Sequence, residues 1–352
     1  MYRGIGGVSR VAGTLGGRVG GRGRSDTVSR VTAATPPKEQ LERALETVIG
    51  RCLDIRGGEH VLVIGDYEPD SRALAEALRD TAARYGADAV LALMDARAND
   101  GTEPPPPIAA ALAVCDVYVI PTSRSLSHTE ARRAATNAGA RGATLPGVTA
   151  DMLARMMAID FDALKARTLQ VTELLEQADS AHVTCAHGSD LTLDLTGRRG
   201  LADYGEISSG AKFGNLPAGE GFIAPLSASG TLAATSLAPL GISPEPVLLT
   251  VEDGHLTAAN GPFGPEFLER LQQHGPDGTN VAELGVGTND AAILTGNVLE
   301  DEKILGTVHV AFGASAGIGG TVSVPIHLDV VVTEPTLDVG ATRVLDAGRW
   351  VL

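Results

Sequence analysis

The pattern of apolar residues changes once along the chain, near residue 180, and this change limits the possible folds more than any other feature. Over residues 38–145, helical periodicity alternates with short continuous apolar runs such as His60–Ile64. Beyond residue 180, short alternating segments separated by glycine-rich turns replace that pattern. Alternating helices and buried strands are typical of a parallel sheet covered on both faces, whereas short alternating segments are typical of antiparallel strands. We therefore predict a Rossmann-like α/β domain with a parallel sheet over residues 37–180 and an α+β domain over residues 181–352.

Residues 1–36 differ in composition from the rest of the chain, with six arginines, one acid and many glycines. A segment without a periodic apolar stripe buries too little surface to offset the entropy of ordering it. The sequence therefore predicts a disordered Gly/Arg-rich extension. No run along the chain approaches the roughly 18 apolar residues of a membrane span, so no membrane partner is expected.

Charge and cysteine usage exclude several classes of protein. A formal charge of -15 and an aromatic content of 3% disfavour nucleic acid as a partner, because a phosphate backbone is repelled and base-stacking side chains are scarce. Cys52, Cys115 and Cys185 are odd in number and lack C-x-x-C spacing, which disfavours a disulfide framework or a cysteine-type zinc site. We expect a cytoplasmic protein.

Two histidines near the C-terminus lie in segments that read as strands. His327 and Asp329 fall in the alternating segment Val322–Val332, where residues two apart share one face of a strand. His309 falls in the preceding apolar segment, and the turn at Gly317–Gly320 predicts a hairpin that brings both imidazoles together. A structural Asp–His hydrogen bond is the alternative interpretation of the pair.

Two glutamates complete this group of donors. Glu220 lies between two glycines and Glu283 lies two residues before one, in segments expected to be loops or strand ends. Each taken singly is compatible with an ordinary surface carboxylate. Together with the two histidines and Asp329, they form the donor set that zinc, cobalt, manganese or ferrous iron prefers. A metal enzyme is the leading hypothesis.

Two other segments are candidates with weaker support. Glu300–Lys303 is a short charged run, which is usually solvated at the surface. Ser125–Arg132 follows the third predicted strand, and loops at the carboxyl ends of parallel strands commonly hold ligands. Its hydroxyl groups are equally explained by capping of the following helix.

Four linked motifs resemble the aminopeptidase T, or thermophilic leucyl aminopeptidase, family of metallopeptidases, from about residue 38 to the end. They are Asn215–Glu220, Glu283–Asn289, Leu299–Gly313 and Ile326–Asp329. The resemblance implies a homodimeric hydrolase that releases N-terminal amino acids from small peptides. It also implies one or two divalent metal ions, usually zinc or cobalt, held at Glu220, Glu283, His309, His327 and Asp329, with one of the glutamates as general base.

One position departs from the peptidase pattern, because Ala316 stands where that family has a tyrosine. The chain is also similar to the 2,5-dihydroxypyridine dioxygenases of the same superfamily, and that resemblance implies a single ferrous ion at His309, His327 and Asp329 acting on a small aromatic substrate. A non-catalytic descendant is the third hypothesis. The two retained glutamates favour the aminopeptidase, since a mononuclear site needs fewer acids.

Overall fold

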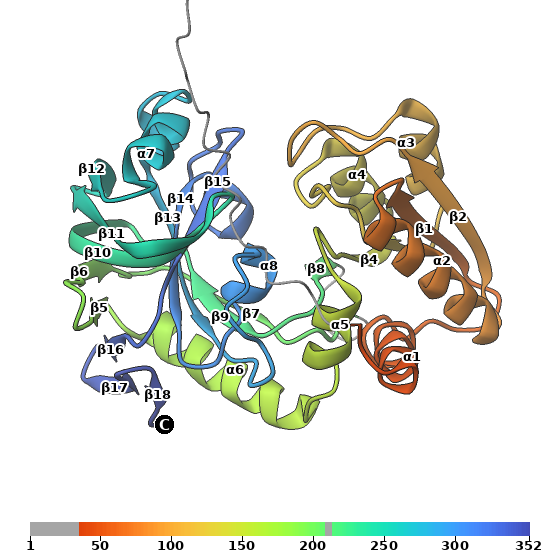
Figure 1. Ribbon diagram of the computed structural model, residues 1–352, viewed down its shortest axis with the longest axis horizontal. Helices are drawn as coiled ribbons and strands as arrows, with labels where there is room; N and C mark the ends of the chain where they lie inside the picture. Colours follow the sequence, from red (N-terminus) through yellow and green to blue (C-terminus); the bar gives the residue numbers. More distant parts are fainter. Residues whose placement is uncertain (1–34, 208–212) are drawn as a thin grey trace, which may run out of the picture. The chain divides into compact units, whose positions relative to one another are not determined.

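The structure is a computed structural model that describes residues 35–207 and 213–352. The extension predicted over residues 1–36 therefore lies outside the described residues, apart from its last two. Within these ranges, two sheets of different character carry the fold (Figure 1).

The first sheet is parallel, as the sequence predicts. Its five strands in the described residues run in the order β2-β1-β3-β4-β8. The strands are β1 (His60–Asp66), β2 (Asp88–Met94), β3 (Val117–Ile120), β4 (Arg141–Thr144) and β8 (Phe213–Asn215). Strand β8 comes from beyond residue 180, so the chain returns to this sheet after leaving it.

The helices before residue 180 accompany this first sheet, except for the last, α6, which packs against the second sheet. They are α1 (Lys38–Glu46), continued by the π-helical turn η1 (Thr47–Cys52), then α2 (Pro69–Arg84), α3 (Pro106–Leu112), α4 (Glu130–Ala138), α5 (Ala150–Met156) and α6 (Phe161–Gln177). At three of the helix starts, the side-chain oxygen of the capping residue accepts a hydrogen bond from a backbone N–H group of the first turn; these residues are Thr129, Thr149 and Asp160. The cap at Asp160 begins α6 as a helix separate from α5, which ends at Met156.

The second sheet is antiparallel, strongly curved and contains thirteen strands in the described residues (Figure 1). Its main order is β18-β17-β16-β5-β6-β10-β15-β14-β13-β9-β7, with β11 and β12 added at β10. The strands before α7 are β5 (Ser180–Thr184), β6 (Asp190–Asp194), β7 (Gly200–Asp203), β9 (Glu220–Ile223), β10 (Ser227–Leu237), β11 (Gly241–Glu252) and β12 (His255–Asn260). Those after it are β13 (Val281–Gly287), β14 (Val308–Gly313), β15 (His327–Val332), β16 (Thr336–Val339), β17 (Thr342–Asp346) and β18 (Arg349–Trp350).

Short helices accompany the second sheet: α7 (Gly264–Gln272), η2 (Pro276–Thr279), α8 (Val298–Asp301) and η3 (Ala316–Ile318). The predicted strand over Val322–Val332 is wrong in its first half, because strand pairing begins only at His327. Among the described residues, no helix combines the length and apolar character needed to cross a membrane.

Candidate metal centre

The five predicted metal ligands lie on four neighbouring strands of the antiparallel sheet. Strands β15, β14, β13 and β9 are hydrogen-bonded in that order. They carry His327 and Asp329 (β15), His309 (β14), Glu283 (β13) and Glu220 (β9). Segments that are up to about a hundred residues apart in sequence are thus brought side by side.

Strand register places the side chains on one face of the sheet. Ala311 of β14 lies opposite Glu283 on one side and Asp329 on the other, so these three residues form a row across the strands. His309 and His327 each lie two residues before a member of this row, and residues two apart on a strand share a face. The predicted sharing of a face by His327 and Asp329 follows from the same rule.

Glu220 joins this face through the next strand pair. It lies opposite Gly287, four residues beyond Glu283 on the same strand, and an even separation keeps the same face. Glu220 and Glu283 are both buried, with relative exposures of 7% and 6%. The prediction that they lie in loops or at strand ends therefore holds only for Glu220, which begins β9, while Glu283 is within β13.

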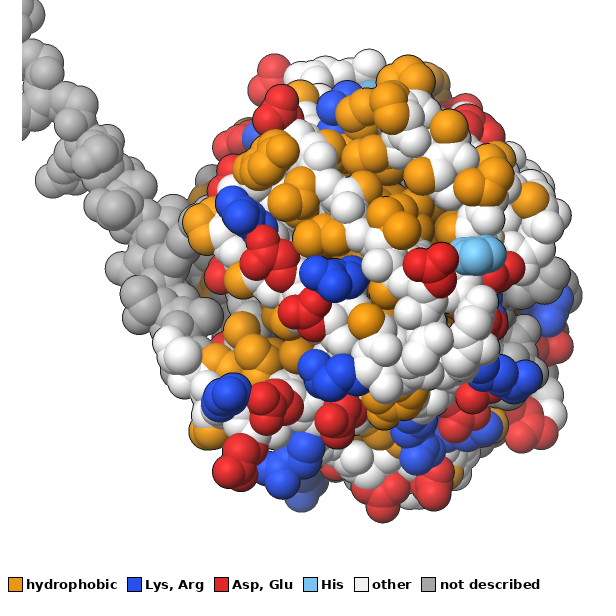
Figure 2. All heavy atoms as spheres, turned by 90° about the vertical axis from the view of Figure 1, so that its right-hand side faces the viewer, with side chains coloured by type: hydrophobic (Ala, Val, Ile, Leu, Met, Phe, Trp, Pro, Cys, Tyr) orange, Lys and Arg blue, Asp and Glu red, His pale blue; other side chains and the backbone are white. Residues whose placement is uncertain are grey.

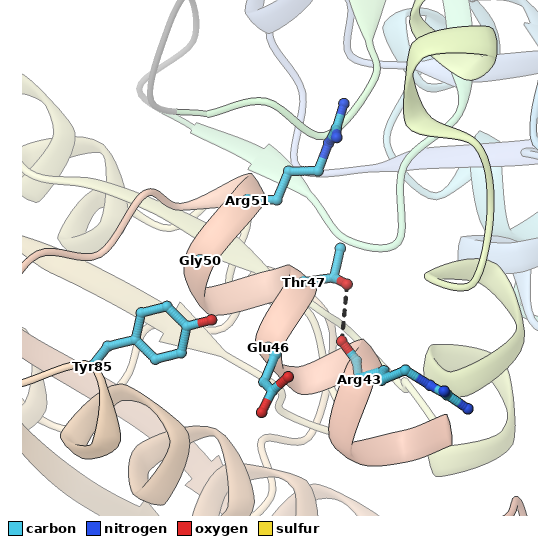
Figure 3. Close-up of a pocket in the computed structure, with 6 residues that line it drawn as sticks. All are labelled: Arg43, Glu46, Thr47, Gly50, Arg51 and Tyr85. Atoms are coloured by element: carbon cyan, nitrogen blue, oxygen red, sulfur yellow. Dashed lines mark hydrogen bonds between the residues drawn. The ribbon is translucent and has the colours of Figure 1, made fainter. Parts of the chain in front are cut away.

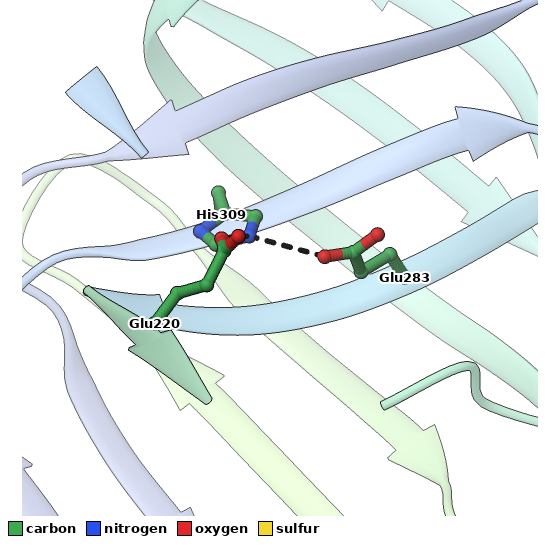
Figure 4. A group of neighbouring side chains, drawn as sticks. All are labelled: Glu220, Glu283 and His309. Carbon is green, nitrogen blue, oxygen red and sulfur yellow. Dashed lines mark hydrogen bonds and ion pairs between the residues drawn. The ribbon is translucent and has the colours of Figure 1, made fainter. Parts of the chain in front are cut away.

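The donor atoms gather into two sets of three that share Glu283. In the inner set, Nε2 of His309 lies 3.2 Å from Oε2 of Glu220 and 3.3 Å from Oε1 of Glu283. Figure 4 shows the two glutamates approaching the imidazole from different strands. The His309 side chain is 1% exposed, so the inner set is closed to solvent.

The outer set consists of Glu283, His327 and Asp329. Nε2 of His327 lies 3.4 Å from Oε2 of Glu283 and 3.6 Å from Oδ1 of Asp329. The side chains of His327 and Asp329 are 22% and 13% exposed. Nδ1 of His327 lies 2.8 Å from the Ala314 carbonyl oxygen. Because an Nδ1–H group that donates to this carbonyl directs the Nε2 lone pair toward the carboxylates, the outer set is oriented as a metal-binding imidazole requires.

A glycine makes room for the buried histidine. Gly285 lies directly opposite His309, and a Cβ atom at this position would come within 2.0 Å of Nε2 of that imidazole. Any side chain at residue 285 would therefore displace the ring from the two glutamates. The glycine-rich stretch of β13 is thus part of the construction of the site.

A buried lysine, which the sequence reasoning did not single out, occupies the inner end of the cluster. Lys303 is fully buried, and its Nζ lies 2.7 Å from Oε1 of Glu220 and also pairs with Glu302. The carboxylates of Glu220, Glu302 and Asp203 outweigh the burial that opposes its charge, so the pKa of Lys303 is raised. The sequence contains one signal for its burial, since this lysine directly precedes the apolar residues Ile304 and Leu305.

The remaining residues of the charged run Glu300–Lys303 are also buried, so its interpretation as a solvated surface run is wrong. Glu300 accepts hydrogen bonds from Arg155 at 2.6 and 3.1 Å. Asp301 accepts a hydrogen bond from Ser236 at 2.7 Å. Paired in this way, both carboxylates hold α8 in place and do not face the donor sets.

The charges of the cluster shift its titration strongly. Burial opposes a charge on His309 and on His327, but the neighbouring carboxylates outweigh it and raise the pKa of both imidazoles well above the ordinary value. Burial also opposes the charge on Glu220, yet Lys303 and His309 lower its pKa to about 2. Burial raises the pKa of Glu302 to about 8. The site therefore carries an excess of carboxylates that either protons or a cation must balance.

The first sheet contributes one side chain next to the outer set. The ring centroid of His128 lies 6.3 Å from that of His327, with the rings tilted by 42°. His128 belongs to the segment Ser125–Arg132, in which Thr129 caps α4. The capping interpretation is therefore confirmed at Thr129, while a ligand at this segment stays a prediction, with His128 beside the cluster.

A separate depression of about 590 Å³ lies on α1, η1 and the end of α2. It is lined by Arg43, Glu46, Thr47, Gly50, Arg51 and Tyr85. Figure 3 shows Arg43 and Arg51 pointing away from each other, so their charges do not converge on a common ligand. None of these residues belongs to the donor sets.

Together, the fold and the site define a two-sheet protein with a buried cluster of carboxylates and imidazoles of the kind that binds transition metals. The chain belongs to the 2,5-dihydroxypyridine 5,6-dioxygenase (NicX) family, whose family model matches residues 40–352. A 2,5-dihydroxypyridine 5,6-dioxygenase of Pseudomonas putida is 28% identical over 197 residues, or 51% of this chain. The match spans 56% of that relative, a little over half its length.

Two solved structures share the fold. A 2,5-dihydroxypyridine dioxygenase from Pseudomonas putida KT2440 has a TM-score of 0.75 at 23% identity, over 90% of this chain and 98% of that one. AmpT from Thermus thermophilus has a TM-score of 0.65 at 18% identity, over 90% and 100% of the two chains. Both structures show that the fold is shared, and the family match confirms the resemblance to the 2,5-dihydroxypyridine dioxygenases.

The leading expectation of a metallopeptidase is wrong. The matching family and the curated relative are both named as dioxygenases, so the terms hydrolase, aminopeptidase and protease do not apply. The alanine at residue 316 disfavoured the metallopeptidase, whereas the two retained glutamates favoured it. These glutamates misled because Glu220 is paired with Lys303, a partner whose position the sequence alone does not reveal.

Proposed function

We propose that this protein is a ferrous iron-dependent dioxygenase that opens the ring of a dihydroxylated nitrogen heterocycle such as 2,5-dihydroxypyridine. The family match over residues 40–352 carries this proposal. The donor chemistry fits in part: ferrous oxygenases commonly use two imidazoles and one carboxylate with open coordination positions, and the outer set provides one imidazole and two carboxylates.

We place the ion in the outer set, at Glu283, His327 and Asp329. This set is the more exposed of the two, and the hydrogen bond from His327 to the Ala314 carbonyl fixes the donor nitrogen toward the carboxylates. When bound there, ferrous iron supplies the activation of molecular oxygen and of the hydroxylated ring. The inner set, which an ammonium group already balances at Glu220, would shape and polarise the site from behind.

The chain itself supplies orientation and selectivity. Glu283 is shared by both sets, so its position is determined by His309 on one oxygen and by His327 on the other. His128 would face a ring bound at the outer set and restrict its approach. The burial of Glu220, Glu283 and His309 keeps water away from the inner set.

Oxygen consumption tests the proposal directly. Protein loaded anaerobically with one equivalent of ferrous iron is mixed with 2,5-dihydroxypyridine, and dissolved oxygen and ring absorbance are followed together. We expect about one oxygen molecule consumed per ring lost, and no release of p-nitroaniline from aminoacyl p-nitroanilides. No oxygen uptake with this substrate or with a panel of other dihydroxylated rings would refute the dioxygenase.

A matched pair of variants identifies the site. His327→Ala should abolish iron retention and oxygen uptake, whereas His187→Ala, which removes an exposed histidine, should retain both. Iron content below about half an equivalent in the wild-type protein after reconstitution would favour the non-catalytic descendant. Iron retention by His327→Ala would show that the ion does not bind at the outer set.

A further inference from the structure

Hydroxyl groups of the first sheet gather at the carboxyl ends of two of its strands. Ser125, Ser127 and Thr129 follow strand β3, and Thr144 is the last residue of β4. On the side of the molecule where β2 and α3 lie, apolar side chains instead gather over the upper part of the surface (Figure 2). Ser127, Thr129 and Thr144 are buried. Because buried hydroxyl groups require hydrogen-bond partners, their partners show what these residues hold in place.

Three of the hydroxyl groups form a chain of hydrogen bonds that ends on an amide. Oγ of Ser125 donates to Oγ of Ser127 at 2.9 Å. Oγ of Ser127 lies 2.7 Å from Oγ1 of Thr144, which donates to Oδ1 of Asn215 at 2.6 Å. A hydroxyl group has one proton to donate, so Thr144 accepts the proton of Ser127 and passes its own to the amide. The chain therefore has one direction, from Ser125 to a carbonyl oxygen that only accepts.

Strand β8 holds the same turn through a second residue. Phe213 and Asn215 lie two residues apart on this strand, so their side chains share a face. The guanidinium carbon of Arg132 lies 3.9 Å from the centre of the Phe213 ring. Nε of Arg132 donates a hydrogen bond to the Ser127 carbonyl oxygen at 2.7 Å. Strand β8 therefore fixes Ser127 twice, at its hydroxyl group through Asn215 and at its carbonyl through Arg132.

The turn held in this way carries His128, the side chain next to the outer set. The His128 imidazole forms no hydrogen bond with any of the described residues. Its position therefore depends on the backbone of its two neighbours. Ser127 is fixed by the contacts above, and Oγ1 of Thr129 donates to the Leu126 carbonyl oxygen at 2.8 Å. A change in the hydroxyl chain would thus shift the imidazole relative to the outer set.

We propose that Ser127, Thr144 and Asn215 are positioning residues, which hold His128 against an aromatic ring bound at the outer set. Thr144 is the central member, because it links the turn after β3 to β8. Asn215 lies five residues before Glu220, so the segment that supplies a donor to the inner set also fixes the His128 turn. This role rests on the proposed function, since it requires a ring at the outer set.

Amide hydrogen exchange of the full-length protein tests the positioning without any reaction. Thr144→Val replaces the central hydroxyl group with a methyl group of similar size, so Ser127 loses its acceptor. We expect exchange at the amides of Ser127 and Thr129 to become at least ~5-fold faster, whereas Thr144→Ser should keep the wild-type rates. Thr81→Val is the matched control, because it removes a fully buried hydroxyl group from α2, and it should leave both amides unchanged.

A double-mutant cycle tests whether Thr144 acts through His128. With iron-loaded protein and 2,5-dihydroxypyridine, Thr144→Val should lower kcat ~10-fold, change KM less than ~3-fold and leave the iron content unchanged. In the His128→Ala background it should lower kcat by less than ~2-fold further, because the imidazole that it displaces is already absent. Thr144→Ser should retain the wild-type kcat, and so should Thr81→Val.

Two outcomes overturn the proposal. The first is exchange at Ser127 and Thr129 that Thr144→Val leaves unchanged, or that Thr81→Val accelerates equally. The second is an equal loss of kcat on Thr144→Val with and without His128, which would show that Thr144 acts by another route. Absence of oxygen uptake by the wild-type protein would instead refute the proposed function, and the exchange rates would still decide whether the hydroxyl chain holds the turn.

Discussion

The inner and outer donor sets share Glu283 but balance its charge in different ways. In the inner set, His309 is almost fully enclosed, and the protein provides a cation of its own in Lys303. In the outer set, His327 and Asp329 retain some exposure, and no lysine or arginine of the described residues is paired with them. Two sets of chemically similar donors therefore have different roles. Lys303 already balances the negative charge of the inner set, whereas the negative charge of the outer set still requires a cation.

This comparison also explains why the acids were misinterpreted. Counted along the sequence, Glu220 and Glu283 increase the number of ligands and favour a two-metal centre. In the structure, one carboxylate oxygen of Glu220 forms an ion pair with the ammonium group of Lys303. Its contribution is therefore to hold the buried side of the site together.

The largest effect is expected from removing the buried ammonium. Lys303→Met leaves Glu220 and Glu302 without their cation, and breaking a buried ion pair typically destabilises a protein by about 3–5 kcal/mol. Urea unfolding monitored by circular dichroism measures the free energy of unfolding. Lys38→Met, whose side chain is 88% exposed, should cost less than about 0.5 kcal/mol. Equal losses in both variants would mean that Lys303 does not balance the inner set.

The next effect separates the two sets by metal affinity. Asp329→Asn should weaken metal binding at least ~100-fold, because it removes an anionic ligand from the outer set. Glu220→Gln should weaken it less than ~10-fold, because Glu220 acts from the inner set. Competition with a chromogenic chelator measures both dissociation constants. The reverse order of the two effects would place the ion in the inner set.

A smaller effect is expected at the substrate side. His128→Ala should lower kcat/KM about 10- to 100-fold and leave the metal content unchanged, because the residue faces the outer set without belonging to it. His60→Ala, an exposed histidine of the same sheet, is the matched control. Loss of metal from His128→Ala would instead identify His128 as a ligand.

The smallest effect concerns pH. The carboxylates raise the pKa of His309 and His327 in the folded, metal-free protein, so both imidazoles bind protons more tightly when folded than when unfolded. The resulting stability is fully present below the ordinary pKa of about 6.5 and is lost as pH rises through the raised values. Thermal unfolding of chelated protein should therefore shift down by about 2 °C per pH unit above neutrality.

Metal-loaded protein provides the control for this pH effect. A dication bound at the outer set takes the place of the proton on His327, so the melting temperature of the metal-loaded protein should depend less on pH over the same range. Identical pH profiles with and without metal would show that the imidazoles do not exchange protons for a cation.

Much of the secondary structure followed from local patterns in the sequence. The apolar run His60–Ile64 is reproduced within a few residues as β1, His60–Asp66. The break before α6 occurs at Asp160, whose side chain caps the helix. Boundaries that depend on pairing were less predictable, as at β15, where alternation continues upstream of His327 but the partner strand β14 ends at Gly313.

Within the site, the sequence alone determined that His327 and Asp329 share a face, because side chains alternate along any strand. It also determined that the donors are imidazoles and carboxylates. Only the tertiary structure decided how they divide into two sets, because that depends on the order β15-β14-β13-β9 and on the register around Ala311. The burial of Lys303 against Glu220 was decided in the same way, because a charge becomes buried only when distant segments fold over it.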